Sequence, residues 1–79
     1  MTFKSRTGLM GGTQPGQKVT RQNIKELPPG SVVRNGDGSR IIHLHDDIWL
    51  WCKDGAWCYD KVEYLSWRLD EKSVLCHIP

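Results

Sequence analysis

Histidine and cysteine side chains are the first candidates for chemistry in this chain. His43 and His45 are two residues apart, so a strand would place both imidazoles on one side. Three cysteines and one further histidine could add ligands: Cys52, Cys58, Cys76 and His77. A structural zinc site needs four such ligands to converge, and the chain contains no C-x₂-C pair. We therefore predict ordinary sheet histidines and no metal site.

Catalytic arrangements are equally hard to build. Cys76 and His77 are neighbours, and neighbouring residues of a strand point to opposite faces. Asp46 and Asp47 stand where a turn is expected, and aspartate is common in turns for backbone reasons. The sequence has neither a phosphate-binding loop nor a nucleophile elbow. We predict a protein that is not an enzyme and needs no cofactor.

The cysteines and the apolar segments indicate a cellular compartment. Three cysteines are an odd number, which favours reduced thiols over a disulfide framework. No apolar run approaches the roughly 18 residues that cross a bilayer, and no signal-peptide pattern is visible. The expectation is an intracellular protein without a membrane contact.

The aromatic residues are crowded into one segment. All four tryptophans, and six of the seven aromatic residues, lie between Trp49 and Trp67. Tryptophan and tyrosine are enriched at binding hot spots, so these rings could anchor a partner protein or a second copy of the chain. They could equally fill the small core of a 79-residue protein. The candidate protein-binding residues are Trp49, Trp51, Trp57 and Trp67.

The charges are divided unevenly along the chain. Residues 1–25 carry five basic residues and no acid, which gives +5. Residues 26–79 carry six Lys/Arg and nine Asp/Glu, which gives −3. A basic segment can follow a phosphate backbone, so nucleic-acid binding is the alternative function. The residues that would carry it are Lys4, Arg6, Lys18, Arg21 and Lys25.

Turn residues and hydrophobic periodicity predict a mainly β fold. Residues 1–19 are rich in glycine and read as a flexible basic arm, whereas residues 20–79 read as one small domain. Within it we expect a short helix capped by Thr20, four strands, a second helix and a closing strand. Their ranges are Thr20–Leu27, Ser31–Arg34, Ser39–His45, Ile48–Cys52, Ala56–Tyr59, Lys61–Leu69 and Ser73–Ile78. The sum is an antiparallel meander or a partly open, SH3-like barrel.

Local sequence signals also predict the start of the second helix and the register of the hairpins. Asp60 and Glu63 have the spacing of a capping box at the start of the second helix. A two-residue turn at Asp54-Gly55 would place Trp51 opposite Cys58 and Cys52 opposite Trp57, so that the two cysteines point to opposite sides.

A two-residue turn at Asp46-Asp47 would likewise pair Leu44 with Trp49. One face of the sheet would then hold Ile42, Leu44, Trp49, Trp51 and Cys58, and the other Ile41, His43, Leu50, Cys52 and Trp57.

Residues 20–79 resemble a family of small proteins of unknown function from actinobacteriophages. The similarity rests on the opening segment Thr20–Arg34, which contains Leu27-Pro28-Pro29-Gly30-Ser31-Val32-Val33. A tryptophan-rich hairpin, a short helix and a terminal strand with Val74-Leu75 follow. The resemblance implies a phage accessory protein that binds a host factor or a virion component, in the host cytoplasm or in the virion. It supplies no functional residues.

Overall fold

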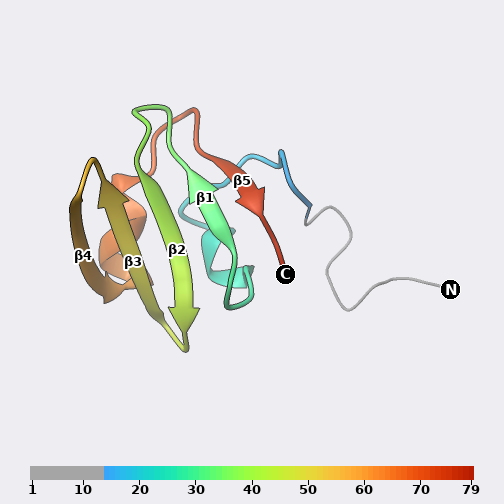
Figure 1. Cartoon of the computed structure of the whole chain (residues 1–79). Coiled ribbons are helices and arrows are strands. Elements are labelled where there is room, and N and C mark those ends of the chain that lie inside the picture. Colours follow the sequence, from blue (N-terminus) through green and yellow to red (C-terminus); the bar gives the residue numbers. More distant parts are fainter. Residues whose placement is uncertain (1–13) are drawn as a thin grey trace, which may run out of the picture.

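A computed structural model of the chain describes residues 14–79. Five antiparallel strands form one sheet in the order β4-β3-β2-β1-β5 (Figure 1). The strands are β1 (Val32–Arg34), β2 (Arg40–His45), β3 (Ile48–Lys53), β4 (Ala56–Lys61) and β5 (Val74–His77). The mainly β prediction with one short α-helix is confirmed, and the sheet remains open because β4 and β5 are its edge strands.

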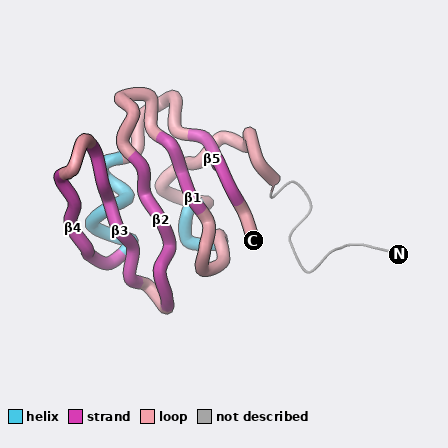
Figure 2. The backbone as a smooth tube through the Cα atoms, viewed as in Figure 1, coloured by secondary structure: helices cyan, strands magenta, loops and turns pink. Residues whose placement is uncertain are grey.

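Three short helical segments lie on one face of this sheet (Figure 2). They are η1 (Ile24–Glu26), α1 (Val62–Leu65) and η2 (Ser66–Arg68). The core lies between these segments and the sheet, and its buried hydrophobic residues are Val19, Ile24, Leu27, Val33, Ile41, Trp49, Leu65 and Leu75. In the described part of the chain, no helix is long and apolar enough to cross a membrane.

The hairpin of β3 and β4 has the predicted register. Trp51 lies opposite Cys58, and Cys52 lies opposite Trp57. Asp54 has φ 49° and Gly55 has φ 87°, and positive φ at both central residues is the signature of a type I′ turn. All three cysteines are free thiols.

The predicted register of β2 is wrong by one residue. The turn at Asp46-Asp47 is as expected, since His45 lies opposite Ile48, but the register shifts between His43 and His45. Leu44 is the extra residue of this β-bulge, so that His43 rather than Leu44 lies opposite Trp49.

A bulge of one residue exchanges the two faces of the strand, because side chains alternate along it. The core face therefore holds Ile41 and His43 together with Trp49, Trp51 and Cys58. The predicted separation of His43 from Cys58 is wrong for the same reason.

The predicted capping box is also wrong. Asp60 belongs to β4, where it lies opposite Trp49, and its Oδ1 accepts a hydrogen bond from the backbone N–H of Lys61 at 2.8 Å. The N-cap of α1 is Lys61, without a side-chain cap. The α-helix is four residues long and continues as η2. Pairing with β3 thus extends the strand over the residues that the sequence assigned to a helix start.

The segment before η1 is closed by two side chains. Thr20 Oγ1 accepts from the backbone N–H of Asn23 at 3.3 Å, and Asn23 Oδ1 accepts from the N–H of Thr20 at 2.9 Å. Thr20 therefore closes the turn before η1 but does not cap it as predicted, because η1 covers only Ile24–Glu26 and its N-cap is Asn23, without a side-chain cap. Ile24 and Leu27 are both buried, as their spacing predicted.

The described part of the N-terminal segment runs along β5. Gly16 N–H donates to Leu75 O at 2.7 Å, Leu75 N–H donates to Gln17 O at 2.8 Å, and Val19 N–H donates to Ser73 O at 3.0 Å. Val19 is also part of the core. Residues 14–19 therefore belong to the β domain, and residues 1–13 of the predicted arm lie outside the described part.

A buried polar network ties the loop between β1 and β2 to the segment before β5. Asn35 Nδ2 donates to Ser39 Oγ at 2.8 Å, and Asn35 Oδ1 accepts from Ser73 Oγ at 2.6 Å. Asp70 accepts from the backbone N–H of Gly36 at 2.9 and 3.0 Å. This network fixes one end of β1 and β2.

Candidate binding surface

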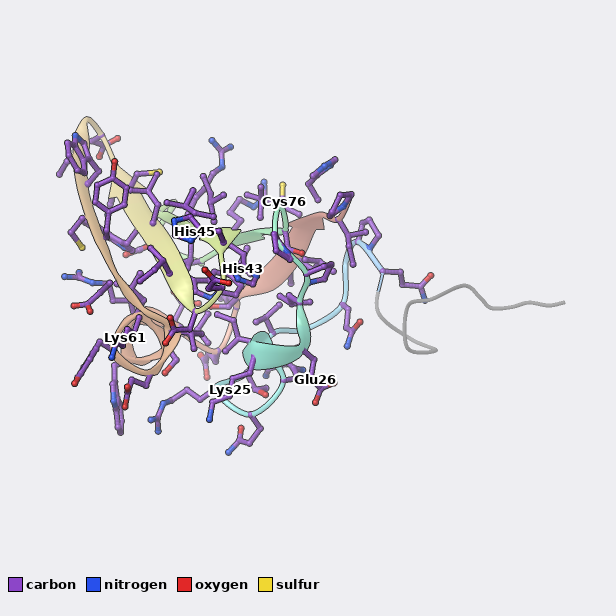
Figure 3. The ribbon with its side chains drawn as sticks, turned by 90° about the horizontal axis from the view of Figure 1, so that it is seen from below. Lys25, Glu26, His43, His45, Lys61 and Cys76 are labelled. Carbon is purple, nitrogen blue, oxygen red and sulfur yellow. The ribbon has the colours of Figure 1, made fainter. Side chains whose placement is uncertain are left out.

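The face of the sheet opposite the helical segments carries the candidate site. We call it the uncovered face, because no described element packs on it (Figure 1). Figure 3 shows Lys25 and Glu26 of η1 on the helical side and Cys76 on the other side of the sheet. Strand register assigns to the uncovered face Val32, Arg34, Arg40, Ile42, Leu50, Cys52, Trp57 and Tyr59.

Two aromatic side chains project from this face at its edge. Trp57 is 61% exposed and Tyr59 is 58% exposed. Their rings meet edge to face, with centroids 5.1 Å apart and planes at 67°. Both stand on β4, which has no described strand beyond it, so nothing shields their outer sides.

Two arginines face each other on the same surface. Arg34 of β1 lies directly opposite Arg40 of β2, and both are exposed. Like charges opposite each other on neighbouring strands repel. Within residues 14–79, the ion pairs are His45–Asp46 and Lys53–Asp37, so neither arginine has an acidic partner there. An anionic group bound to this pair would relieve the repulsion.

Arg40 and Trp57 lie in the same cross-strand row. Arg40 lies opposite Cys52, which in turn lies opposite Trp57. The three residues and the Asp54-Gly55 turn line a shallow depression of about 270 Å³. A bound group could therefore touch both the cation and the aromatic ring.

The predicted anchors Trp49 and Trp51 serve the core. Trp49 is 1% exposed and stacks on His43, with centroids 4.4 Å apart and planes at 6°. Trp51 is half-buried against the core, and the guanidinium of Arg68 lies 4.3 Å from its ring centroid. Trp49 offers no surface to a partner.

The remaining predicted anchor lies on the helical side. Trp67 is 69% exposed, and the Arg21 guanidinium lies 3.3 Å from its ring centroid. Tyr64 is also exposed there. Trp57 and Trp67 thus belong to different surfaces, because one is on β4 and the other on η2.

The basic residues of the alternative function are dispersed. Lys4 and Arg6 lie outside the described residues. Lys18 is exposed, and its backbone forms an isolated β-bridge with Val74 of β5. Arg21 and Lys25 line one depression on the helical side, and Arg21 Nε also donates to Ser66 Oγ at 3.4 Å. These three described cations do not form one continuous surface.

The candidate metal ligands are separated as well. Within residues 14–79, no three His, Cys, Asp or Glu side chains are arranged to hold a metal ion. His43 is buried between the sheet and the helical side (Figure 3), and its Nδ1 lies 2.8 Å from the carbonyl oxygen of Leu27. Its Nε2 faces the carbonyl oxygen of Asp46, so a backbone carbonyl lies against each ring nitrogen.

The chain matches no protein-family model, no curated protein and no solved structure. The function must therefore be argued from the surface itself. Arg34, Arg40 and Tyr59 were absent from the predicted sites. Arg34 and Arg40 directly flank the Asn35–Ser39 loop, and this placement could have indicated that they face each other across the hairpin.

Proposed function

We propose that the protein is a non-enzymatic binding protein, that its partner is another protein, and that the uncovered face makes the contact. The exposure of Trp57 and Tyr59 carries this proposal. Burying one large aromatic ring removes on the order of 200 Å² from water, so two adjacent rings are a strong anchor.

The surroundings of the two rings support the proposal. Half-buried Ile42 and Leu50 continue the apolar surface across the sheet, and Arg34 and Arg40 lie in the same cross-strand row as Trp57. Tryptophan, tyrosine and arginine are the residue types that dominate binding hot spots. The two-residue Asp54-Gly55 turn fixes the register of β4 on β3, and a pre-formed strand loses less entropy on binding. The proposal that the partner is a host factor or a virion component rests on the resemblance of residues 20–79 alone.

Site-specific photo-crosslinking tests the protein-binding function. A photoreactive phenylalanine analogue replaces Tyr59 in one variant and Tyr64 in another. The two tyrosines have the same exposed fraction, 58%, and lie on different surfaces. We expect a discrete crosslinked protein from the Tyr59 variant in a lysate of the host, and none from the Tyr64 variant. Equal labelling at both positions would contradict the proposed surface.

A single-stranded nucleic acid is the second candidate partner for the uncovered face. The unpaired Arg34 and Arg40 favour it, because guanidinium groups bind phosphates and bases stack on exposed aromatic rings. Asp60, the acidic residue of the described strands, points to the opposite side of the sheet, whereas Asp54 of the β3–β4 turn borders the depression beside Arg40. Residues 14–79 carry nine Lys/Arg and nine Asp/Glu, and Arg34 and Arg40 give this face a local positive charge.

The salt dependence of the affinity distinguishes a nucleic-acid partner from a protein partner. An R34Q/R40Q variant should lower the affinity for a labelled oligonucleotide, and each lost phosphate contact should reduce the logarithmic salt slope by about 0.7. An R21Q/K25Q variant is the control for the helical side. Removal of residues 1–13 tests the basic arm without removing Val19 from the core. If the deletion alone abolishes binding, the arm rather than the uncovered face binds the nucleic acid.

A further inference from the structure

The free edge of β4 provides an inference that goes beyond the proposed function. We propose that β4 pairs antiparallel with β4 of a second copy of this chain, so that two sheets become one continuous sheet across a two-fold axis. The proposal rests on the edges of the sheet, on the direction of the backbone groups, and on the order of side chains along Ala56–Lys61.

The two edges of the sheet differ in their backbone hydrogen bonds to neighbouring segments. At the β5 edge, residues 16–19 supply backbone hydrogen bonds to Ser73 and Leu75. At the β4 edge, the described residues include no such segment, and α1 lies behind the sheet rather than beside it (Figure 1). An unpaired edge presents a row of free N–H and C=O groups that another strand can occupy.

The hairpin register shows which backbone groups are free. The residues that flank a two-residue turn form a hydrogen-bonded pair, and such pairs alternate along an antiparallel ladder. Because Ala56 is the flanking residue, Ala56, Cys58 and Asp60 direct their backbone groups toward β3. Trp57 and Tyr59 therefore direct their N–H and C=O groups outward, and they also carry the exposed rings.

The usual protection of an edge strand is missing from the middle of β4. Its six residues pair with β3 without a register shift, and none is proline or glycine. Charges occur only at its end, at Asp60 and Lys61. Edge strands of proteins that stay monomeric commonly carry a central lysine, a proline or a bulge.

The side chains of β4 match an inverted copy of the same strand. A two-fold axis through Cys58 places Trp57 opposite Tyr59 of the second copy, and the reverse pair forms on the other side. Cross-strand aromatic pairs are among the stabilising contacts of antiparallel sheets. The same register brings Lys61 next to the turn of the second copy, which contains Asp54, and it leaves α1 outside the paired segment.

A disulfide between the two copies of Cys58 would detect this register. The backbone groups of Cys58 point toward β3, so Cys58 and its symmetry mate would form a non-hydrogen-bonded pair, with Cα atoms about 4.5 Å apart. A disulfide needs a Cα separation of roughly 4.4–6.8 Å. Cys52 and Cys76 lie on β3 and β5, away from the axis.

The mass of the purified full chain in solution is the first test. Sedimentation or light scattering should give twice the monomer mass, and Tyr59→Glu should return the protein to a monomer with an unchanged circular dichroism spectrum. Tyr64→Glu makes the same change at an equally exposed site and should leave the dimer intact. A monomer at all concentrations would overturn the proposal, as would a dimer that survives Tyr59→Glu or is lost in Tyr64→Glu.

Cysteine crosslinking is the second test, and it does not depend on a destabilising substitution. With diamide as the oxidant, a C52S/C76S variant that retains Cys58 should form a covalent dimer rapidly. A C52S/C58S variant retains Cys76, which is exposed, and should crosslink at least tenfold more slowly. The opposite order of rates would show that another surface mediates association. A monomer that instead binds the partner protein along β4 would also overturn the dimer while leaving the proposed function intact.

Discussion

His43 of β2 and Trp49 of β3 stack face to face, with ring centroids 4.4 Å apart and planes at 6°. The pair joins three parts of the molecule. Trp49 is the largest fully buried side chain, and His43 reaches the backbone of Leu27 on one side and of Asp46 on the other. The bulge at Leu44 makes this contact possible, because it turns His43 into the core.

Replacement of His43 by phenylalanine should destabilise the protein although it preserves an aromatic ring. A neutral imidazole donates one hydrogen bond, so at least one of the carbonyl oxygens of Leu27 and Asp46 would lose its donor, and a buried polar group left unsatisfied costs about 1–3 kcal/mol. His45→Phe is the control, since that side chain is 70% exposed. Urea denaturation measures both, and equal stabilities of the two variants would contradict the role of the carbonyl contacts.

Trp49→Ala and Trp57→Ala should have opposite consequences. Removal of the buried Trp49 ring should lower the free energy of unfolding by about 3–5 kcal/mol. In the dissociated monomer, Trp57→Ala should change it by at most about 0.5 kcal/mol, because the ring is exposed there, yet it should remove partner binding. Thermal unfolding and the crosslinking assay measure the two effects. A large loss of stability in Trp57→Ala would place that ring among the structural residues instead.

Much of the fold could be predicted from local signals. The Asp54-Gly55 turn fixed the register of β3 and β4, because only a few conformations close a two-residue hairpin. The bulge in β2 could not be predicted in this way. It depends on the contacts of His43 with Leu27 and Trp49, and Leu27 is 16 residues away along the chain. Asp60 became a strand residue for a similar reason, since pairing with Trp49 outweighed its capping signal.

The candidate surface was only partly predictable. Composition identified the aromatic residues, but exposure depends on which strand lies at the edge, and strand order is a tertiary property. The opposition of Arg34 and Arg40 follows from the five-residue loop between them. That loop is held by Asn35 and Ser73, which are 38 residues apart in the sequence. Such a contact has no local signal.

The turn that positions Trp57 should tolerate Asp54→Asn better than Gly55→Ala. Gly55 has φ 87°, a region that costs an L-amino acid roughly 1–2 kcal/mol. Gly55→Ala should therefore lower the free energy of unfolding by about that amount, and the space around Gly55 is open, so no steric clash adds to it. Asp54→Asn should be nearly neutral, because asparagine tolerates positive φ well. Chemical denaturation that ranks Asp54→Asn as the worse variant would rule out the type I′ turn.

Acid should weaken the contact that ties the β1–β2 loop to the segment before β5. Hydrogen bonds from the backbone N–H of Gly36, and further bonds from Lys72 and Ser73, lower the pKa of Asp70 below its ordinary value of 3.8. Hydrogen bonds from Ser39 likewise lower the pKa of Asp37. For both groups the unfolded chain binds a proton at a higher pH than the folded chain does. Their contribution to stability is therefore complete above about pH 5 and is lost as the pH falls through the lowered values.

An Asp70→Asn variant isolates the contact between Asp70 and Gly36, which joins the segment before β5 to the β1–β2 loop. The variant should be less stable than the natural chain at pH 7, because the charged acceptor for Gly36 is gone. The difference should shrink as the pH falls below 4, since the natural chain then loses the same charge. Glu71→Gln is the matched control, because Glu71 is exposed and accepts no hydrogen bond from a described residue. Urea midpoints between pH 7 and pH 2 measure the effect, and parallel curves for Asp70→Asn and the natural chain would show that the Asp70 carboxylate does not contribute to the acid dependence.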